Sequence, residues 1–560
     1  MRYLALVTDY DGTLARGGDV EAATLQALAA LRQSNRFLIM VTGRILDDLA
    51  SIFKKIDLFD AIVAENGAVL YEPAQKKRAV LAPPPPPELA QLLQARGVPL
   101  EGVGDVIVAT REPHEKTVLD TIRELGLEMQ LIFNKGAVMV LPSGVNKASG
   151  LDAALKVLKL SAHNAVGVGD AENDHAFLTL CECSAATGNA LDSVKAHADI
   201  VLEKPNGQGV TSLATSILEN DLADVSLEHR RVSFGTASDG AEILIDPYLR
   251  GTMLFAGASG HGKSTAASGF VERLMQRGYQ VCVVDPEGDY DTLGDAIVLG
   301  DAKTIPTLAE VGDVLDNPER SAIVNLLGVQ MHDRPAYVDE LLPHLFSCRA
   351  RFGRPHWIVL DEAHHLFPSQ RDPDAILPRE LYGLLAITTE PNHLAPALLT
   401  TVQTVVAVGD DAAATIEKAT GATLNDKVSK PSDSHVLLWQ AHAPHEAVLA
   451  EPWPPQSKKT RHRRKYAEGD LAPEKSFFFQ GPDGKLNLRA NNLTIFAQIA
   501  EGIDDETWSH HLRRGDYAKW FEQAIGDDEL AQAAHRAQRE PQTSRERILA
   551  AIREKYTGPA

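Results

Sequence analysis

Residues 3–13 read YLALVTDYDGT, an apolar run that ends in two carboxylates, Asp9 and Asp11, and a glycine. The run has the length and composition of a buried strand. Open parallel sheets bind ligands in the crevice beyond the carboxyl ends of their strands. The pattern therefore predicts two carboxylates, at i and i+2, in such a crevice. One of them can attack a phosphorus atom while the other donates and recovers a proton.

The sequence around this stretch predicts an α/β sheet. Residues 1–215 alternate amphipathic helical stretches with further short apolar runs, at 37–41, 61–63 and 165–168. That alternation is typical of strands joined by crossover helices. The proline run 83–87 cannot continue a helix and indicates a hinge or the boundary of an inserted module.

Three groups of polar residues follow the later strands. Thr42 and Gly43 come directly after the run 37–41, where a hydroxyl and free backbone N–H groups can hold a phosphoryl oxygen. Lys147 can supply a cation for phosphate charge. The run 165–168 is followed by Gly169-Asp170-Ala171-Glu172-Asn173-Asp174, which offers oxygen ligands to a hard divalent cation.

Taken in order, these residues resemble the four signature motifs of the HAD phosphatase superfamily. The resemblance implies that Asp9 is a nucleophile that forms an aspartyl-phosphate and that Asp11 is the general acid/base. It also implies a phosphate site and a Mg²⁺ site. The phosphate residues are Thr42, Gly43, Lys147 and Asn173, and the metal residues are Asp9, Asp11 (through its backbone carbonyl), Asp170 and Asp174.

The spacing of these motifs predicts where a cap domain is inserted. Residues 14–41 are too few to hold a cap, whereas residues 45–146 are enough for a sheet crossover and an inserted α/β cap at about 80–145. That placement resembles the type IIB (Cof-like) branch, whose members mostly dephosphorylate sugar phosphates and related small metabolites. Arg111, His114 and Asn134 are the cap residues that we expect either to read the substrate or to lie on solvated cap surface.

A second set of motifs begins at residue 253. The apolar run Met253–Ala256 is followed by GASGHGKS at 257–264, the G-x-x-x-x-G-K-S pattern in its required place between a strand and a helix. Its glycines let backbone N–H groups wrap a β-phosphate, Lys263 reaches the β and γ oxygens, and Ser264 binds Mg²⁺. The predicted ATP-binding residues are Gly257, Gly260, His261, Gly262, Lys263, Ser264 and Thr265.

The second half of this nucleotide site is predicted at residues 357–364. The apolar run 357–360 ends in Asp361-Glu362-Ala363-His364. We expect Asp361 to hold Mg²⁺ and Glu362 to polarise the attacking water, which favours a motor-like ATPase over a kinase. The run 398–402 predicts a further strand, after which Gln403 is either a γ-phosphate sensor or a polar loop residue.

The class of ATPase is indicated by Asp285-Pro286-Glu287-Gly288-Asp289-Tyr290, which resembles the D-P-x-G-E-Y element of HerA-like and FtsK-like ATPases. The resemblance covers roughly residues 230–450. A superfamily 2 helicase, which also carries D-E-A-H, needs a second RecA-like domain, for which the chain has no room. Relatives often form hexameric rings with an arginine finger from a neighbouring subunit, and the candidate fingers are Arg351, Arg354 and Arg379.

These patterns predict an α/β chain of three domains. A HAD Rossmann-like domain with its cap spans 1–215, and a RecA-like P-loop ATPase domain spans 227–452. A linker at 453–475 leads to a small, mostly helical domain at 476–560, to which we assign a role in interaction or assembly. The third domain opens with a short β segment at 476–480.

Composition limits the partners. The 560 residues carry a net charge of −21, which disfavours nucleic acid because phosphate neutralisation needs a basic face. The basic run 458–465 is either a solvated linker or a nucleic-acid contact. No apolar run reaches the roughly 20 residues of a membrane helix, no signal peptide is apparent, and four cysteines do not suggest disulfides or zinc. We therefore expect a cytoplasmic protein without a membrane partner.

Three functional hypotheses follow. The leading one is a bifunctional enzyme that removes phosphate from a small metabolite and hydrolyses ATP, with Mg²⁺ at both sites and assembly into homo-oligomers. The alternative is a nucleic-acid-processing ring translocase with a polynucleotide-end phosphatase. The third is a nucleotide-gated assembly switch in which the phosphatase domain is a sensor.

Overall fold

The computed structural model describes residues 1–258, 260–370, 377–378, 381–425, 431, 434–456, 466, 471, 475–525 and 527–557. The chain divides into two compact units. One comprises residues 1–284, 294–324 and 328–456, and the other comprises residues 285–293, 325–327 and 457–560. The first unit holds both the acidic motifs of residues 9–174 and the P-loop.

The N-terminal region is built on an eight-stranded sheet in the order β12-β11-β10-β1-β2-β3-β4-β5. Strands β12 through β3 pair in parallel, and β4 and β5 continue the sheet antiparallel. Because Thr8 of β1 lies beside Met40 and Val168, the segments after β1, β2 and β10 leave the sheet at the same edge. The strands are β1 (Ala5–Thr8), β2 (Phe37–Val41), β3 (Ala61–Ala64), β4 (Val69–Glu72), β5 (Lys77–Val80), β10 (Ala165–Gly169), β11 (Cys183–Ala186) and β12 (Ile200–Val201).

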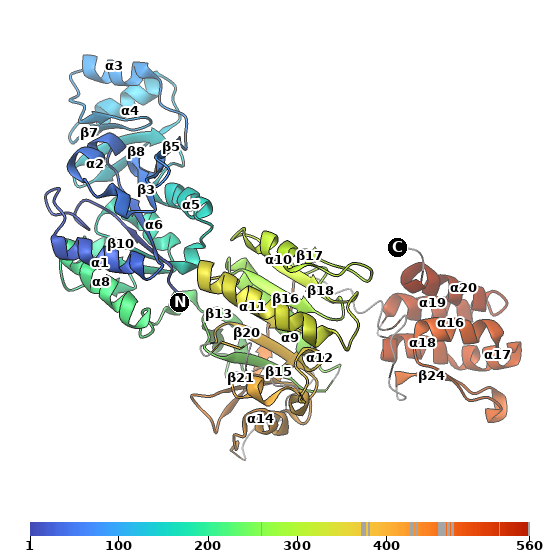
Figure 1. Cartoon of the computed structure of the whole chain (residues 1–560). Helices are drawn as coiled ribbons and strands as arrows, with labels where there is room; N and C mark the ends of the chain where they lie inside the picture. Colours follow the sequence, from blue (N-terminus) through green and yellow to red (C-terminus); the bar gives the residue numbers. More distant parts are fainter. Residues whose placement is uncertain are drawn as a thin grey trace. The chain divides into compact units, whose positions relative to one another are not determined.

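Helices cover both faces of this sheet (Figure 1). One face packs against α1 (Ala22–Gln33), α2 (Leu46–Ile52) and α8 (Asn206–Asn220). The other packs against α5 (Lys147–Val157), α6 (His175–Leu180) and α7 (Asp192–Lys195). Two covered faces explain why the strands read as continuous apolar runs instead of alternating. The α/β fold predicted for this region is therefore confirmed.

A second, smaller sheet is inserted between β5 and α5. It is antiparallel, in the order β6-β7-β9-β8, and has its own apolar core with two helices. Its elements are α3 (Pro87–Ala95), β6 (Gly102–Val103), β7 (Val108–Arg111), α4 (Glu115–Glu124), β8 (Met129–Asn134) and β9 (Ala137–Pro142). These elements fall inside the segment where the sequence predicts a cap.

The P-loop region is built on an eleven-stranded sheet in the order β14-β13-β23-β22-β21-β15-β20-β19-β16-β18-β17. Strands β21, β15, β20, β19 and β16 are parallel neighbours. The strands are β13 (Val232–Ala237), β14 (Glu242–Ile245), β15 (Thr252–Ala256), β16 (Val281–Asp285), β17 (Ile297–Leu299), β18 (Ala322–Asn325), β19 (Trp357–Leu360), β20 (Leu384–Thr388), β21 (Val402–Ala407), β22 (Val436–Gln440) and β23 (Ala447–Pro452). The helices are α9 (Lys263–Gln276), α10 (Leu308–Leu315), α11 (Arg334–Phe352), α12 (Ala363–Leu366), α13 (Pro396–Leu399) and α14 (Ala412–Thr420).

The C-terminal region is a hairpin followed by short helices around an aromatic core that includes Phe477, Phe496 and Trp520. The elements are β24 (Phe477–Phe479), β25 (Leu488–Ala490), α16 (Leu493–Gly502), α17 (Asp505–Arg514), α18 (Asp516–Trp520), α19 (Asp528–Gln538) and α20 (Ser544–Ile552). The predicted basic run 458–465 lies outside the described residues.

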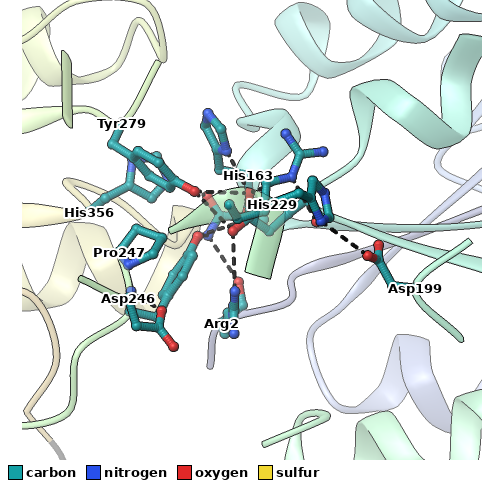
Figure 2. A network of polar contacts seen from close by, with 12 residues as sticks. Arg2, His163, Asp199, His229, Asp246, Pro247, Tyr279 and His356 are labelled. Carbon is teal, nitrogen blue, oxygen red and sulfur yellow. Dashed lines mark hydrogen bonds and ion pairs between the residues drawn. The ribbon is translucent and has the colours of Figure 1, made fainter. Parts of the chain in front are cut away.

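A buried polar network joins the N-terminal and P-loop regions inside the first unit (Figure 2). At its centre is Glu182, which lies between α6 and β11 and is fully buried. Its carboxylate accepts hydrogen bonds from Arg2 at 3.2 Å and from Tyr279, just before β16, at 3.0 Å, and its Oε2 lies 2.7 Å from His163 Nδ1. His356, just before β19, hydrogen-bonds to the N-terminal region through Asn164 at 3.2 Å.

All four cysteines are free, as expected. None of the helices in the described part of the chain combines the length and the apolar character that a bilayer crossing requires.

Candidate active sites

Three carboxylates meet at one edge of the N-terminal sheet. Asp9 follows β1, Asp170 follows β10, and Asp174 ends the short helical turn Glu172–Asp174. Each contributes an oxygen to a group whose members all lie within 4.8 Å of one another. All three residues are buried, Asp9 with 4% of its surface exposed and the other two with none. Three of the predicted metal residues are thus brought together from distant parts of the sequence.

Lys147 provides the cation that this acidic group needs. It is the first residue of α5, is 1% exposed, and its Nζ lies 2.5 Å from both Asp9 Oδ1 and Asp174 Oδ1. Burial alone would lower the pKa of Lys147, but the charges of Asp174 and Asp9 hold that pKa above its ordinary value. Burial raises the pKa of Asp9, the charge of Asp174 adds to this rise, and the charge of Lys147 opposes it.

The donor set fits a hard divalent cation, which prefers several carboxylate and carbonyl oxygens. Asp174 is already engaged, because its Oδ2 accepts the backbone N–H groups of Asp170 and Ala171 at 2.8 and 2.9 Å while its Oδ1 receives Lys147. Asp174 therefore positions the loop as well as belonging to the acidic group, and each of the three carboxylates could ligate the ion. Thr13 donates a hydrogen bond to Asp170 at 3.0 Å and orients that carboxylate.

Asp11 lies outside this group of three carboxylates and is held by Arg44. The guanidinium makes two hydrogen bonds to the carboxylate, at 2.6 and 2.7 Å. The hydrogen bond from Arg44 to Asp11 is the main cause of the raised pKa of Arg44. Asp11 is 41% exposed at its side chain, so it is accessible to a ligand or to water.

The predicted phosphate residues lie around the same edge. Thr42 is fully buried, and its hydroxyl accepts the backbone N–H of Arg44 at 3.1 Å. A Cβ built on Gly43 would lie 3.4 Å from the sulfur of Met139 and 3.8 Å from Asn173 Nδ2, so both the cap strand β9 and the Asn173 loop approach the Thr42-Gly43 turn.

One segment of the site, Glu65-Asn66-Gly67, was not predicted from the sequence. Asn66 Oδ1 accepts a hydrogen bond from Asn173 at 2.9 Å, whereas Asn66 Nδ2 is buried and has no hydrogen-bond partner among the described residues. Buried Glu65 accepts the backbone N–H groups of residues 105–107, which lie between strands β6 and β7 of the cap. The backbones of Glu65 and Asn66 both have positive φ, 51° and 54°. The Asn-Gly pair after a strand was a detectable turn signal, but it did not indicate a ligand site.

The cap contributes an unpredicted lysine, Lys135, at the turn between β8 and β9. Its Nζ forms an ion pair with Asp170. Of the cap residues that were predicted, Arg111 pairs with Glu101 at 2.7 Å on the cap itself, His114 precedes α4, and Asn134 ends β8 next to Lys135.

The P-loop has the backbone that its glycines predict. Gly257, Gly260 and Gly262 all have positive φ, and a Cβ on Gly257 would collide with the carbonyl oxygen of Val408. Lys263 begins α9, is 6% exposed, and donates to the carbonyl of Ala258 at 3.1 Å. Ser264 and Thr265 follow in the first turn of α9, and Ser259 lies outside the described residues.

The Asp361-Glu362 pair lies at the carboxyl end of β19. Asp361 is 1% exposed, and Glu362 has a left-handed backbone with φ 42°. Glu362 Oε2 lies 3.4 Å from His364 Nδ1, and the same nitrogen lies 3.3 Å from the hydroxyl of Thr388 at the end of β20. Thr388 was not predicted, although the apolar run that precedes it could have indicated a strand ending at the same edge.

The prediction for Gln403 is wrong. Residues 396–399 form helix α13, and the strand begins at Val402, so Gln403 stands near the start of β21 instead of beyond its end. Parallel pairing sets Val402 beside Thr252 and Ala407 beside Ala256. A Cβ on Gly251, which precedes β15, would meet the Gln403 side chain. Gln403 is therefore at the opposite edge of the sheet from the P-loop.

The arginine-finger candidates separate clearly. Arg354 is 2% exposed and donates to the backbone carbonyls of Leu315, Asp316 and Lys159, so it is a structural residue and the prediction for it is wrong. Arg351 is exposed near the end of α11. Arg379 lies outside the described residues.

The Asp285–Tyr290 segment forms a tight turn. The carboxylate of Asp285 accepts the backbone N–H groups of Glu287, Gly288 and Tyr290 at 2.8 to 3.1 Å. Burial, together with the charge of Asp289, raises the pKa of Asp285 to about 6 in spite of these hydrogen bonds. Asp285 thus fixes the shape of the segment that follows β16.

Fold and sites together define a capped α/β domain with a buried acidic site, followed by a P-loop domain. Residues 6–94 and 101–213 match the family of haloacid dehalogenase-like hydrolases, and residues 236–430 match the central domain of helicase HerA. The chain therefore joins a HAD hydrolase domain to a HerA-type domain.

Two relatives named as phosphatases agree with the first of these matches. A phosphoglycolate phosphatase of Methanothermobacter thermautotrophicus is 29% identical over 216 residues, which cover 37% of this chain and 95% of that protein. Phosphoglycolate phosphatase 2 of Saccharolobus solfataricus is 34% identical over 105 residues, 18% of this chain and 44% of that protein. The crystal structure of a haloacid dehalogenase-like hydrolase from Bacteroides thetaiotaomicron aligns at 17% identity and a TM-score of 0.34, covering 38% of this chain and 99% of that one.

Proposed function

We propose that the chain is a bifunctional enzyme: a Mg²⁺-dependent phosphatase of a small phosphorylated metabolite, joined to an ATP-hydrolysing, motor-like domain. The observation that carries the proposal is the buried group of Asp9, Asp170 and Asp174 around Lys147. Burying three carboxylates together is costly, so such a group usually binds a cation or takes part in a reaction.

The phosphatase reaction would proceed in two steps at Asp9. The Asp9 carboxylate attacks phosphorus, and the departing oxygen takes a proton from Asp11, which Arg44 holds in position. Asp11 then takes a proton from the water that hydrolyses the aspartyl-phosphate. Mg²⁺ held by Asp9 and Asp170 would offset the charge of the phosphoryl group.

Three further groups would hold the phosphate during these steps. Lys147 supplies a positive charge beside Asp9. Thr42 offers a hydroxyl, and the buried amide nitrogen of Asn66 supplies a donor that lacks a partner in the described part of the chain. A phosphoryl oxygen would satisfy that donor, whose burial is otherwise costly.

In the second domain the P-loop would hold ATP, with Lys263 on the phosphates and Ser264 and Asp361 on Mg²⁺. Glu362 would polarise the attacking water. His364 contacts Glu362, and Thr388 contacts His364 in turn. Together they would fix the direction of the Glu362 carboxylate. We also propose that this domain assembles into homo-oligomers, as HerA-type ATPases do in rings.

Two single substitutions separate the two activities. Asp9→Asn should lower phosphate release from phosphoglycolate by about 10³-fold or more, because the nucleophile is lost, and leave ATP turnover unchanged. Lys263→Ala should do the reverse. Phosphate release and ATP hydrolysis are measured on the same two preparations, and survival of both activities in both variants would contradict the proposal.

A second candidate is a nucleic-acid translocase whose phosphatase trims polynucleotide ends. The match to the central domain of helicase HerA favours it. The net charge of −21 opposes it. ATP turnover that rises with added DNA, and a rise that disappears steeply with salt, would establish this candidate; ATP turnover indifferent to DNA would remove it.

A further inference from the structure

The turn Glu65–Gly67, between β3 and β4, has an uncommon backbone. Its three successive residues have positive φ, 51°, 54° and 111°, a conformation that only glycine adopts freely. Two backbone hydrogen bonds of 2.9 Å hold the turn in place. The N–H of Glu65 donates to the carbonyl of Arg44, and the N–H of Asn66 donates to that of Thr42. Backbone strain that the surrounding structure maintains in this way is typical of functional sites.

The side chain of Glu65 reaches from the core to the cap. It is fully buried, and its carboxylate accepts the backbone N–H groups of residues 105–107 at 2.8 to 3.0 Å. These residues lie in the turn between β6 and β7. Successive N–H groups that converge on one point make an anion site. A Cβ on Gly104 would lie 2.5 Å from the carboxylate, so only glycine lets this cap turn close on Glu65.

The other two residues of the core turn face the phosphate site. Asn66 accepts a hydrogen bond from Asn173 at 2.9 Å, and its buried Nδ2 has no partner among the described residues. A Cβ on Gly67 would lie 1.9 Å from the carbonyl oxygen of Asn146, the residue that precedes Lys147. One short turn therefore contacts the cap on one side and two of the proposed phosphate-binding segments on the other.

The cap turn that Glu65 binds is continuous with the part of the cap nearest the site. Strand β7 pairs with β9, and β9 pairs with β8. The turn between β8 and β9 carries Lys135, which pairs with Asp170, and β9 carries Met139, which approaches Gly43. Fixing residues 105–107 thus fixes these two side chains through the sheet. A cap that is already in place does not have to be ordered when a substrate binds, so its contacts contribute more to binding and orientation.

We propose that Glu65 is a positioning residue of the phosphatase site, whose carboxylate fixes the cap, and so the leaving group of the substrate, relative to the phosphate that Asn66 binds. Glu65 acts through the cap and touches no reacting atom. The phosphate end is held independently, by the backbone hydrogen bonds of the turn and by Asn173. This inference rests on the proposed phosphatase function of the same site.

Two variants of the full chain break the contact from opposite sides. Glu65→Gln replaces one acceptor oxygen by an amide group that cannot accept the cap N–H groups, and Gly104→Ala places a methyl group against the carboxylate. Each should lower kcat/KM for phosphoglycolate about 10-fold or more, because the leaving group is no longer held in register. Each should leave the Ki of inorganic phosphate, used as a competitive inhibitor, within about twofold, because the phosphate site lies on the core.

Two further variants separate positioning from general damage. Asn66→Ala should raise the Ki of inorganic phosphate about 10-fold, since it removes a hydrogen bond to a charged group. Glu72→Gln changes another buried glutamate of the core, one that pairs with Lys77 instead of the cap. It is the matched control and should change neither kcat/KM nor Ki.

A second readout needs no catalysis. Amide hydrogen exchange at residues 105–107 of the substrate-free chain should be about 10-fold faster or more in Glu65→Gln than in the wild type, while β9 keeps its protection. Unchanged exchange at these residues, unchanged kcat/KM, or a Ki that rises in parallel with the loss of kcat/KM would each overturn the inference while the phosphatase assignment stands. A wild-type chain that releases no phosphate from phosphoglycolate would overturn the proposed function, and the inference with it.

Discussion

At the scale of single residues, Lys147 is the positive charge that stabilises the buried carboxylates of Asp9 and Asp174. The carboxylates of Asp9 and Asp174 contact its ammonium group, and all three side chains are buried. Removing the cation would leave Asp9 and Asp174 as buried, mutually repelling charges. An unpaired buried charge is among the most destabilising changes a protein can undergo.

Lys147→Met should therefore destabilise the metal-free chain by about 3–5 kcal/mol and abolish phosphatase activity. The urea midpoint of the HAD domain, followed with and without Mg²⁺, measures the first effect. Addition of Mg²⁺ should recover part of the loss, because the ion replaces some of the missing positive charge. Lys156→Met, on the exposed side of the same helix, is the control. A midpoint unchanged from the wild type would show that Lys147 is not the counter-charge.

At the scale of elements, the position of a residue along its strand determines its function. In the P-loop sheet the parallel strands end at one edge, where Thr388 at the end of β20 and Glu362 both contact His364. Gln403 lies at the start of β21, at the opposite end of the strands. The distinction depends on where each strand begins, and not on the residue type.

Thr388→Val should lower the kcat for ATP by about 10-fold or more, because the hydroxyl that contacts His364 behind Glu362 is lost. Gln403→Ala should leave ATP turnover within about twofold, because its side chain lies at the far edge. The measurement is the steady-state kcat for ATP hydrolysis of both variants, each compared with the wild type. The reverse ranking would mean that the strand assignment at residues 396–407 is wrong.

Sequence reasoning succeeded where a motif and a strand end coincide. The runs before Asp9, Thr42, Asp170 and Asp361 are strands in the structure, and the residues after them lie at the expected edges. It failed at residues 398–407, because the predicted strand was placed too early: Leu398 and Leu399 belong to helix α13, and strand β21 begins only at Val402. Pro396 at the start of α13 was the available signal, since proline suits the first turn of a helix.

Other site residues could not have been found from the sequence. Glu65 of the core binds backbone N–H groups of the cap, and Lys135 of the cap pairs with Asp170 of the core. No local sequence pattern predicts contacts between residues of two different sheets. Arg354 is a false positive. It was predicted as a candidate arginine finger, but its guanidinium is buried and donates to backbone carbonyls.

At the scale of the whole molecule, the polar network at Glu182 ties the HAD domain to the P-loop domain (Figure 2). Burial would raise the pKa of Glu182, but the hydrogen bond from His163 and the charges of His163, Arg2 and Arg230 hold that pKa below its ordinary value. The folded chain thus stabilises the ionised carboxylate.

A carboxylate with a depressed pKa contributes stability above its unfolded pKa, about 4.3, and that contribution is lost as the pH falls through the folded pKa. Glu182→Gln should therefore be less stable than the wild type at pH 7, by on the order of 3 kcal/mol. The difference should narrow below about pH 4. Urea unfolding at several pH values measures it, with exposed Glu203→Gln as the control. A difference that stays constant with pH would show that the charge of Glu182 is not what matters.

Asp9 is the group to which we propose that phosphate is transferred. The most direct measurement is mass spectrometry of the chain, quenched in acid during turnover of phosphoglycolate with Mg²⁺. We expect a phosphoryl group on the peptide that contains Asp9, absent in Asp9→Asn and absent when EDTA replaces Mg²⁺. A phosphoryl group on another residue, or phosphate release that persists in Asp9→Asn, would contradict it.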